Sequence, residues 1–208
     1  MKRDDIIQAA IEEFGKYDYN RASVNTIIEN SETSKGTFYH YFKNKADLYL
    51  LLIQKVSFEK MKFLHSTADT DLTVGTELSI FELLRTQMEA SVRFASAYPL
   101  YAMFSSKVAN ETNQEIRKKI DAEIGHATNE YFSELVKQNI KDKILRDDMP
   151  EEFVIKILVY MISHFNEFLL RSGIQVEFEN TTKITEYLNY YVSFMEKGLG
   201  TIDIKKYA

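Results

Sequence analysis

A short stretch of sequence decides the expected fold, Ser34-Lys35-Gly36-Thr37-Phe38-Tyr39-His40-Tyr41-Phe42. Ser34 is predicted to cap a short helix, because a serine oxygen accepts a hydrogen bond from a free backbone N–H in the first turn. Phe38 and Phe42 are four residues apart and are therefore predicted to share the inward face of that helix. The outward arc then carries Lys35, Thr37, Tyr39, His40 and Tyr41. These side chains suit contacts with phosphates and base edges of DNA.

A second short helix is predicted immediately before this one. Ser23 is its candidate cap, and the helix runs to about Asn30. Only the tight turn Ser31–Thr33 separates the two helices, which makes the pair a helix-turn-helix. In that motif the second helix enters the major groove of DNA while the first crosses the backbone.

Helices are also predicted on both sides of this pair. Asp4–Lys16 carries the apolar period of a helix, with acids in its first turn, where the helix dipole favours anions. Asn44 is predicted to cap a long helix that continues through Phe63, and Asp47 completes a variant of the capping box. The polar stretch His65–Thr76 then separates head from body.

The rest of the chain is predicted to be helical as well, so the expected fold class is all-α. The chain is expected to divide into a helix-turn-helix domain, residues 1–48, and a larger helical domain, residues 49–208. The segment Gly173–Asn180 is predicted to be a loop, with a short strand at Gln175–Phe178 as the alternative. The helices of the body are predicted at about Glu77–Ala97, Pro99–Lys107, Asn113–Lys143, Pro150–Ser172 and Thr182–Gly198.

The last two helices are apolar on two sides, whereas an ordinary surface helix has one apolar stripe. In the first of them, one face carries Val154, Leu158, Met161, Phe165 and Leu169, and another carries Ile155, Val159, Ile162 and Leu170. The final helix repeats the pattern with Ile184, Leu188, Tyr191 and Met195 beside Tyr187, Tyr190 and Phe194. Both could be central helices of a monomer. The favoured alternative is a homodimer interface made of these two helices from each subunit.

Composition limits the function classes. The 208 residues are 45% hydrophobic and carry a net charge of −5, and there is no cysteine, which excludes disulfides and thiolate metal sites. Between Ser34 and Lys45 there are cations but no acid, a local basic spot on an acidic chain. The chain shows neither a signal peptide nor an apolar run of the roughly 18 residues that a membrane span needs. A cytoplasmic protein without membrane contact is expected.

The segment Ser23–Leu52 resembles the DNA-binding head of the TetR family of bacterial regulators. The pattern is Ser-Lys-Gly-Thr, aromatic-Tyr, aromatic-Phe, Lys, and an acid followed by Leu. The body matches the family only in length and helical character. The residues that carry the pattern are Ser34, Lys35, Gly36, Thr37, Phe38, Tyr39, Tyr41, Phe42, Lys45, Asp47 and Leu48.

The resemblance implies a three-helix head joined by a long helix to a helical-bundle body, and it implies roles at the DNA. Ser23 and Asn25 would bind phosphate at the start of the backbone-crossing helix. Ser34, at the cap, would also contact DNA, and the residues that would face the major groove are Lys35, Gly36, Thr37 and His40. Tyr39 and Tyr41 would bind phosphates, with core packing as the alternative for each, and Lys45 would bind phosphate at the start of its helix. Lys35 could also be an ordinary solvated lysine.

One position departs from the family pattern. Glu32 stands in the turn where the family usually has glycine, two positions before Ser34. Glycine adopts positive φ freely and glutamate does not. Either the turn has a different conformation or it carries about 1 kcal/mol of strain.

The resemblance further implies that the body binds a small hydrophobic effector and that the protein is a repressor of double-stranded operator DNA, released when the effector binds. Ordinary core packing is the alternative for each candidate contact. The candidates are Met88, Tyr101, Phe104, Tyr131, Met161, His164, Phe165 and Phe168.

Two other function classes are the alternatives to a regulator. An enzyme is not expected, because the chain has no glycine-rich phosphate loop, nucleophile elbow or helical metal motif, and no cofactor or metal is implied. A helical interaction protein that keeps the head but has lost operator binding is the second alternative. Glu32 and the acidic balance favour it, and the salt dependence of DNA binding distinguishes it from a regulator.

Overall fold

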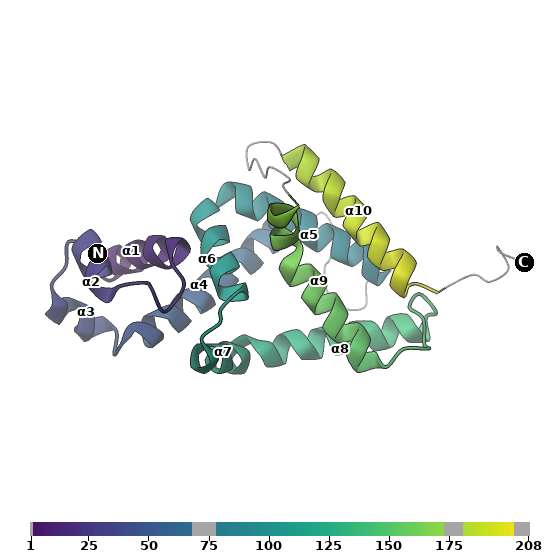
Figure 1. Cartoon of the computed structure of the whole chain (residues 1–208), viewed down its shortest axis with the longest axis horizontal. Coiled ribbons are helices and arrows are strands. Elements are labelled where there is room, and N and C mark those ends of the chain that lie inside the picture. The colour runs from purple at the N-terminus through teal and green to yellow at the C-terminus, as the bar shows by residue number, and fades with distance from the viewer. Residues whose placement is uncertain (1, 68–77, 173–180, 202–208) are drawn as a thin grey trace, which may run out of the picture. The chain divides into compact units, whose positions relative to one another are not determined.

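The computed structural model describes residues 2–67, 78–172 and 181–201, and within these ranges the regular elements are helices (Figure 1). They pack into two compact units. The first comprises Met1–Phe63 and Ala97–Ile124, and the second Leu64–Ser96 and Gly125–Ala208. The expected division after residue 48 thus differs from the packing, because a later segment joins the head. Most of the polar stretch His65–Thr76 and all of the segment Gly173–Asn180 lie outside the described residues.

The helix-turn-helix forms as predicted. Its helices are α1 (Lys2–Lys16), α2 (Val24–Asn30) and α3 (Lys35–Tyr41), followed by the long α4 (Lys45–Thr67). Ser23 and Ser34 cap α2 and α3 with their side-chain oxygens. Asn44 Oδ1 accepts the Asp47 N–H at 2.9 Å, which confirms the cap of α4.

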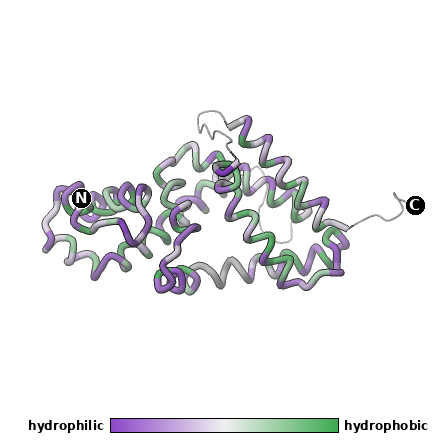
Figure 2. The backbone as a smooth tube through the Cα atoms, viewed as in Figure 1, coloured by the Kyte–Doolittle hydropathy of each residue, from purple (hydrophilic) through white to green (hydrophobic). Residues whose placement is uncertain are grey.

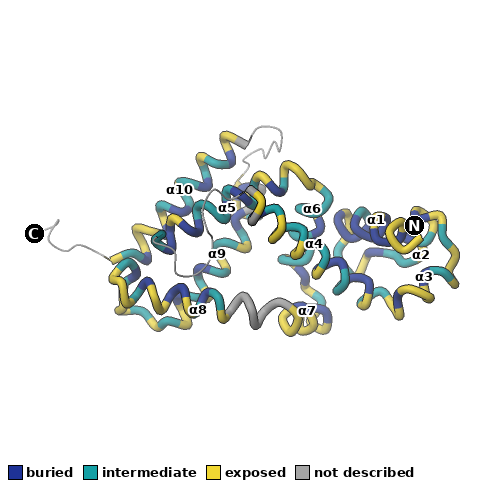
Figure 3. Tube along the Cα trace, turned by 180° about the vertical axis from the view of Figure 1, so that it is seen from behind, coloured by how far each residue is buried: buried dark blue, intermediate teal, exposed yellow. Residues whose placement is uncertain are grey.

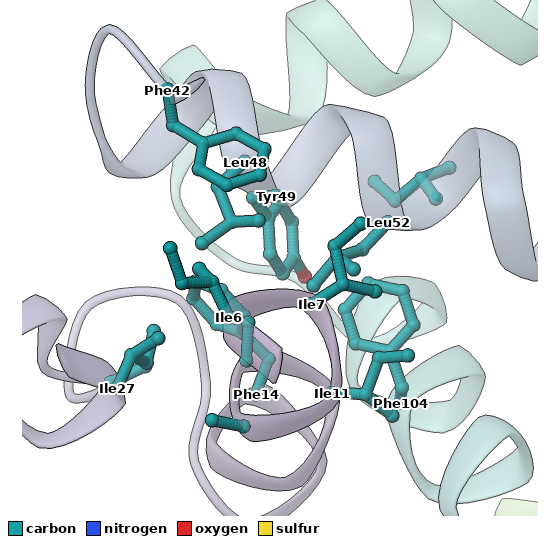
Figure 4. Close-up of a cluster of buried hydrophobic side chains, with 14 of the residues drawn as sticks. Ile6, Ile7, Ile11, Phe14, Ile27, Phe42, Leu48, Tyr49, Leu52 and Phe104 are labelled. Carbon is teal, nitrogen blue, oxygen red and sulfur yellow. The ribbon is translucent and has the colours of Figure 1, made fainter. Parts of the chain in front are cut away.

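The core of the first unit lies between α1, α4 and α6 (Pro99–Ala109), as Figure 4 shows. Phe14, Tyr49 and Phe104 are buried there, and the rings of Tyr49 and Phe104 meet edge to face at 5.4 Å between centroids. A Cβ at Gly15 would lie 3.6 Å from Met103 Cβ, so α1 and α6 approach closely at this point. The following helix, α7 (Gln114–Ile120), adds Ile116 and Ile120 to the same core.

The helix predicted over Asn113–Lys143 is divided. After α7 the chain passes through a π-helical turn, η1 (Asp121–Gly125), and continues as α8 (His126–Lys141). The apolar residues of α7 pack in the first unit and those of α8 in the second, and η1 lies where the chain crosses from one to the other.

The second unit contains α5 (Ile80–Ala97), α8, α9 (Glu151–Arg171) and α10 (Thr181–Leu199). A buried amide joins α5 to α8. Asn139 Oδ1 accepts the N–H of Ile80, the first residue of α5, at 2.9 Å, and Asn139 Nδ2 donates to the Leu135 carbonyl at 2.9 Å. Since that N–H has no partner within its own helix, Asn139 acts as a cap supplied from a neighbouring element.

The two apolar sides of α9 and α10 differ in burial. The first side is core: Val154, Leu158, Phe165 and Leu169 of α9 are buried together with Ile184, Leu188 and Met195 of α10. On α9 the second predicted stripe is only partly right, because Ile155, Val159 and Ile162 are half-buried against that core. Apolar residues recur along most of α9, and exposed residues recur along α9 and α10 (Figures 2 and 3). The large apolar side chains that these two helices expose are Phe153, Tyr160, Phe168, Tyr190 and Phe194.

Candidate nucleic-acid interface

The recognition helix α3 presents a polar face over an apolar anchor. Phe38 and Phe42 are buried, as predicted, and their ring centroids lie 5.7 Å apart. Ser34 Oγ accepts the Thr37 N–H at 3.0 Å and also bonds the Thr37 hydroxyl at 2.9 Å. Thr37 is half-buried, and the other predicted contacts on this helix are exposed: Lys35, Gly36, Tyr39, His40 and Tyr41.

The two phenols of α3 do not belong to the core. Tyr39 is 51% exposed and Tyr41 is 41% exposed, so the core-packing alternative is wrong for both. The Tyr39 ring meets Phe38 edge to face at 5.2 Å. The Tyr41 ring meets His40 at 4.9 Å. Each ring is thereby supported from one side while the residue stays open to solvent.

The start of α2 is fixed from two directions. Ser23 Oγ accepts the Thr26 N–H at 3.4 Å, and the Ser23 N–H donates to the buried Glu13 carboxylate at 2.8 Å. Asn25, in the first turn of α2, is exposed. The α2 N-terminus is therefore held to α1 while the Asn25 side chain stays available to a ligand.

The resemblance implies a phosphate contact at Lys45, and in the structure the Lys45 ammonium is bonded to the protein itself. Its ammonium donates to the carbonyls of Tyr19 at 2.7 Å, Ala22 at 3.0 Å and Asn20 at 3.5 Å, and it lies 4.5 Å from the centroid of the Tyr19 ring. Burial lowers the pKa of Lys45, and nearby carboxylates offset part of that shift. The bonds to Tyr19 and Ala22 have ordinary lengths and hold the ammonium against the loop. Lys45 binds the loop that precedes α2 instead.

The turn between α2 and α3 resolves the question raised by Glu32. Thr33 N–H donates to the Ile28 carbonyl at 3.2 Å and Glu32 N–H to the Glu29 carbonyl at 3.1 Å. This pair of bonds is a Schellman motif, which requires a left-handed residue at the position of Glu32. Glu32 has a φ of 50°, so the turn keeps the conformation that glycine would adopt, and the glutamate carries the strain.

Two cations near α3 were not among the predicted contacts. The Arg3 guanidinium lies 5.8 Å from the centroid of the Phe42 ring, which places it beside the end of α3. Lys43 is exposed, and its backbone N–H donates to Asp47 Oδ2 at 3.0 Å. Lys43 belongs to the basic spot read from the sequence. Arg3 carried no sequence signal, because tertiary packing alone brings α1 to this end of α3.

The sequence of the helix-turn-helix head matches a known protein family. Residues 6–52 match the family model described as bacterial regulatory proteins, tetR family. The head of this chain is thus similar to the DNA-binding heads of that family.

Curated relatives align mainly over the same segment. The transcriptional regulator AcuR of Cereibacter sphaeroides is 37% identical over 54 residues, 26% of this chain and 25% of AcuR. The HTH-type transcriptional regulator QacR of Staphylococcus aureus is 39% identical over 51 residues, 24% of this chain and 27% of QacR. The probable acrEF/envCD operon repressor of Escherichia coli is 24% identical over 98 residues, 47% of this chain and 42% of that repressor. The alignments thus span less than half of each relative.

Solved structures extend the TetR-like fold to the whole chain. A TetR family transcriptional regulator from Chloroflexus aurantiacus superposes with a TM-score of 0.74 at 24% identity, covering 97% of this chain and 94% of that one. FadR of Bacillus subtilis, solved with stearoyl-CoA, has a TM-score of 0.71 at 16% identity and covers 94% and 98%. At these identities the likeness shows the fold, and it confirms the all-α class with a helix-turn-helix head on a helical body.

The residues predicted to line a TetR-type effector site are divided between the two units. Tyr101 and Phe104 belong to the first, where Phe104 is buried against Tyr49 and Tyr101 stacks on Tyr98 at 5.7 Å. Phe104 is thus part of the hydrophobic core of the first unit. The other candidates, in the second unit, are Met88, Tyr131, Met161, His164, Phe165 and Phe168.

Within the second unit, the structure brings some of these candidates together. The rings of Phe165 and Phe168 lie 5.0 and 5.5 Å from that of Tyr191, whose hydroxyl donates to the Met161 carbonyl at 3.0 Å. Gln87 Nε2 donates to the Tyr131 hydroxyl at 2.8 Å, and burial raises the pKa of Tyr131. His164 stacks on Tyr160 at 4.1 Å.

None of the described helices has the length and apolar character that a membrane span needs.

Proposed function

We propose that this protein is a sequence-specific DNA-binding transcriptional regulator, a repressor that leaves its operator when a small, largely apolar ligand binds the body. The observation that carries the proposal is the polar face of α3, exposed above buried Phe38 and Phe42. A helix anchored in this way can enter the major groove with its side chains free for the bases.

The proposed DNA contacts form two groups, those to base edges and those to phosphates. Lys35, Thr37 and His40 would read base edges. Gly36 supports this role, because a Cβ there would meet only Ser34 Oγ at 3.7 Å, so packing does not require a glycine at this position. Its small size lets the backbone approach DNA. The residues proposed to bind phosphates are Ser23, Asn25, Tyr39 and Tyr41, with Lys43 and Arg3 in place of Lys45.

A homodimer is part of the proposal, because a two-headed protein can bind two half-sites on successive major grooves. The exposed aromatic side chains of α9 and α10 support it. Phe153 and Tyr160 recur at helical spacing on α9, and Tyr190 and Phe194 do so on α10. Aromatic residues of this kind are enriched at the centres of protein interfaces.

The effector is proposed to bind in the second unit. Phe165, Phe168 and Tyr191 provide an aromatic group there, and the bond between Gln87 and Tyr131 provides polar atoms. Apolar sites with a few polar groups suit amphiphilic small molecules. That FadR of Bacillus subtilis was solved with stearoyl-CoA supports an acyl compound as one candidate class.

Selection from a pool of random DNA duplexes tests the proposal. The parent protein should enrich one site with two related halves about one helical turn apart. Lys35→Ala should enrich a site with relaxed preference at one base position, while Tyr39→Phe should keep the same site with weaker binding. A pool that stays random after selection by the parent would contradict operator binding and favour a helical interaction protein that retains the head.

A further inference from the structure

The loop that leads into α2, residues 17–23, is held by side chains from three other segments. It ends at Ser23, the cap of α2 and a proposed phosphate contact. Two of the three holding segments lie nearby in the head: Glu13 of α1 accepts the Ser23 N–H, and Lys45 of α4 binds three loop carbonyls.

The third holding segment is the connection between α6 and α7, about ninety residues further along the chain but in the same compact unit. Asn113 Nδ2 donates to Asn20 Oδ1 at 2.7 Å, directly onto the loop. The Asn113 side-chain oxygen is used separately, because it caps α7 by accepting the N–H groups of Glu115 and Ile116 at 3.1 Å. One amide therefore joins the start of α7 to the loop before α2.

A buried carboxylate fixes the position of this amide. Glu111 accepts the Asn113 N–H at 2.7 Å with one oxygen, while its other oxygen lies 3.5 Å from the hydroxyl of the fully buried Tyr49. Burial raises the pKa of Tyr19 and the Glu111 carboxylate adds to that rise, while burial lowers the pKa of Lys45 and Asp18 and Glu111 oppose the lowering, in keeping with a negative charge close to the loop. A buried charge is costly unless it is bonded, so these contacts favour one arrangement of the connection.

We propose that Asn113 and Glu111 are positioning residues for DNA binding, which hold the loop 17–23, and through it Ser23 and the start of α2, without touching DNA. Phosphate contacts set the register of a protein on the duplex, so a loop shift at Ser23 weakens binding to every sequence. The proposal rests on the proposed function. It adds that a segment outside the helix-turn-helix determines the geometry of the phosphate contacts, and α7 joins that segment covalently to η1 and α8.

The test uses the full-length protein with Asn113→Ser, because serine keeps the α7 cap but its shorter side chain does not reach Asn20 Oδ1. The matched control is Asn110→Ala, in the same connection, whose amide bonds only the local Ser106 carbonyl at 3.0 Å. Hydrogen–deuterium exchange over residues 17–27 and DNA affinity at several salt concentrations are measured for both. Glu111→Gln serves as a second variant that keeps the side-chain shape.

Asn113→Ser is expected to speed exchange over residues 17–27 and to weaken binding to operator and random DNA alike by about three- to tenfold, the range of one hydrogen bond. The salt dependence of binding should become shallower, as one phosphate contact is lost. Asn110→Ala should change none of these. Unchanged exchange in both Asn113→Ser and Glu111→Gln overturns the proposal, as does faster exchange with undiminished affinity. If the parent itself bound no DNA, the proposed function would fail, and the exchange result alone would still decide whether the connection holds the loop.

Discussion

At the scale of single residues, Glu32 has a backbone conformation that favours glycine. Its φ of 50° lies in the left-handed region, where a residue with a Cβ is strained by about 1 kcal/mol. Glu32→Gly should therefore raise the free energy of unfolding by about that amount, measured by urea denaturation. Glu32→Gln is the control, because it removes the charge and keeps the strain. Equal stability of the two variants would contradict the strain.

Lys45 and Lys43 are expected to have different roles, since Lys45 stabilises the fold and Lys43 contacts DNA. Lys45→Met keeps the apolar stem but leaves the Tyr19 and Ala22 carbonyls without their partner, which should cost about 1–3 kcal/mol of unfolding free energy. Lys43→Met, at an exposed site, should change stability by less than about 0.5 kcal/mol but weaken DNA binding. The reverse pattern, with Lys45→Met as stable as the parent but deficient in DNA binding, would restore Lys45 as a phosphate contact.

At the scale of the elements, the junction of α5 and α8 depends on one buried amide. Asn139→Ala removes the acceptor for the Ile80 N–H and the donor to the Leu135 carbonyl, both within the core of the second unit. The expected loss is about 1–3 kcal/mol, since a buried N–H is left without a partner. Gln138→Ala is the matched control, because Gln138 bonds only the exposed Asp142 one turn later. Similar urea midpoints for the two variants would rule out the cap.

The elements also show what could be predicted from sequence. The caps Ser23 and Ser34 and the inward placement of Phe38 and Phe42 depend on spacing within one or two turns, and all were predicted correctly. The role of Lys45, the bond from Asn113 to Asn20 and the packing of Phe104 beneath the head were missed. Each depends on tertiary contacts between segments separated by 20 to 100 residues, which helical periodicity cannot encode. The joining of Ala97–Ile124 to the first unit depends on tertiary contacts of the same kind.

At the scale of the whole molecule, the exposed apolar faces of α9 and α10 determine the predicted assembly. Phe194 is 72% exposed, and a charge placed there would be buried in the proposed dimer. Phe194→Glu should weaken dimerisation about thirtyfold or more, measured by sedimentation equilibrium, as expected for a central aromatic residue. Phe58→Glu, at a phenylalanine of α4 that is 67% exposed, is the control and should leave the dimer intact. Equal dissociation by both variants, or by neither, would contradict an interface on α9 and α10.

The measurement that tests the central claim most directly is fluorescence anisotropy of the purified protein with DNA from upstream of its own gene, beside a random duplex, at two salt concentrations. The account predicts tighter binding to the upstream DNA and a steep loss of affinity as salt rises, because phosphate contacts release counterions. Binding that neither prefers the upstream DNA nor weakens with salt would contradict the claim that α3 and its neighbours form a DNA-reading surface.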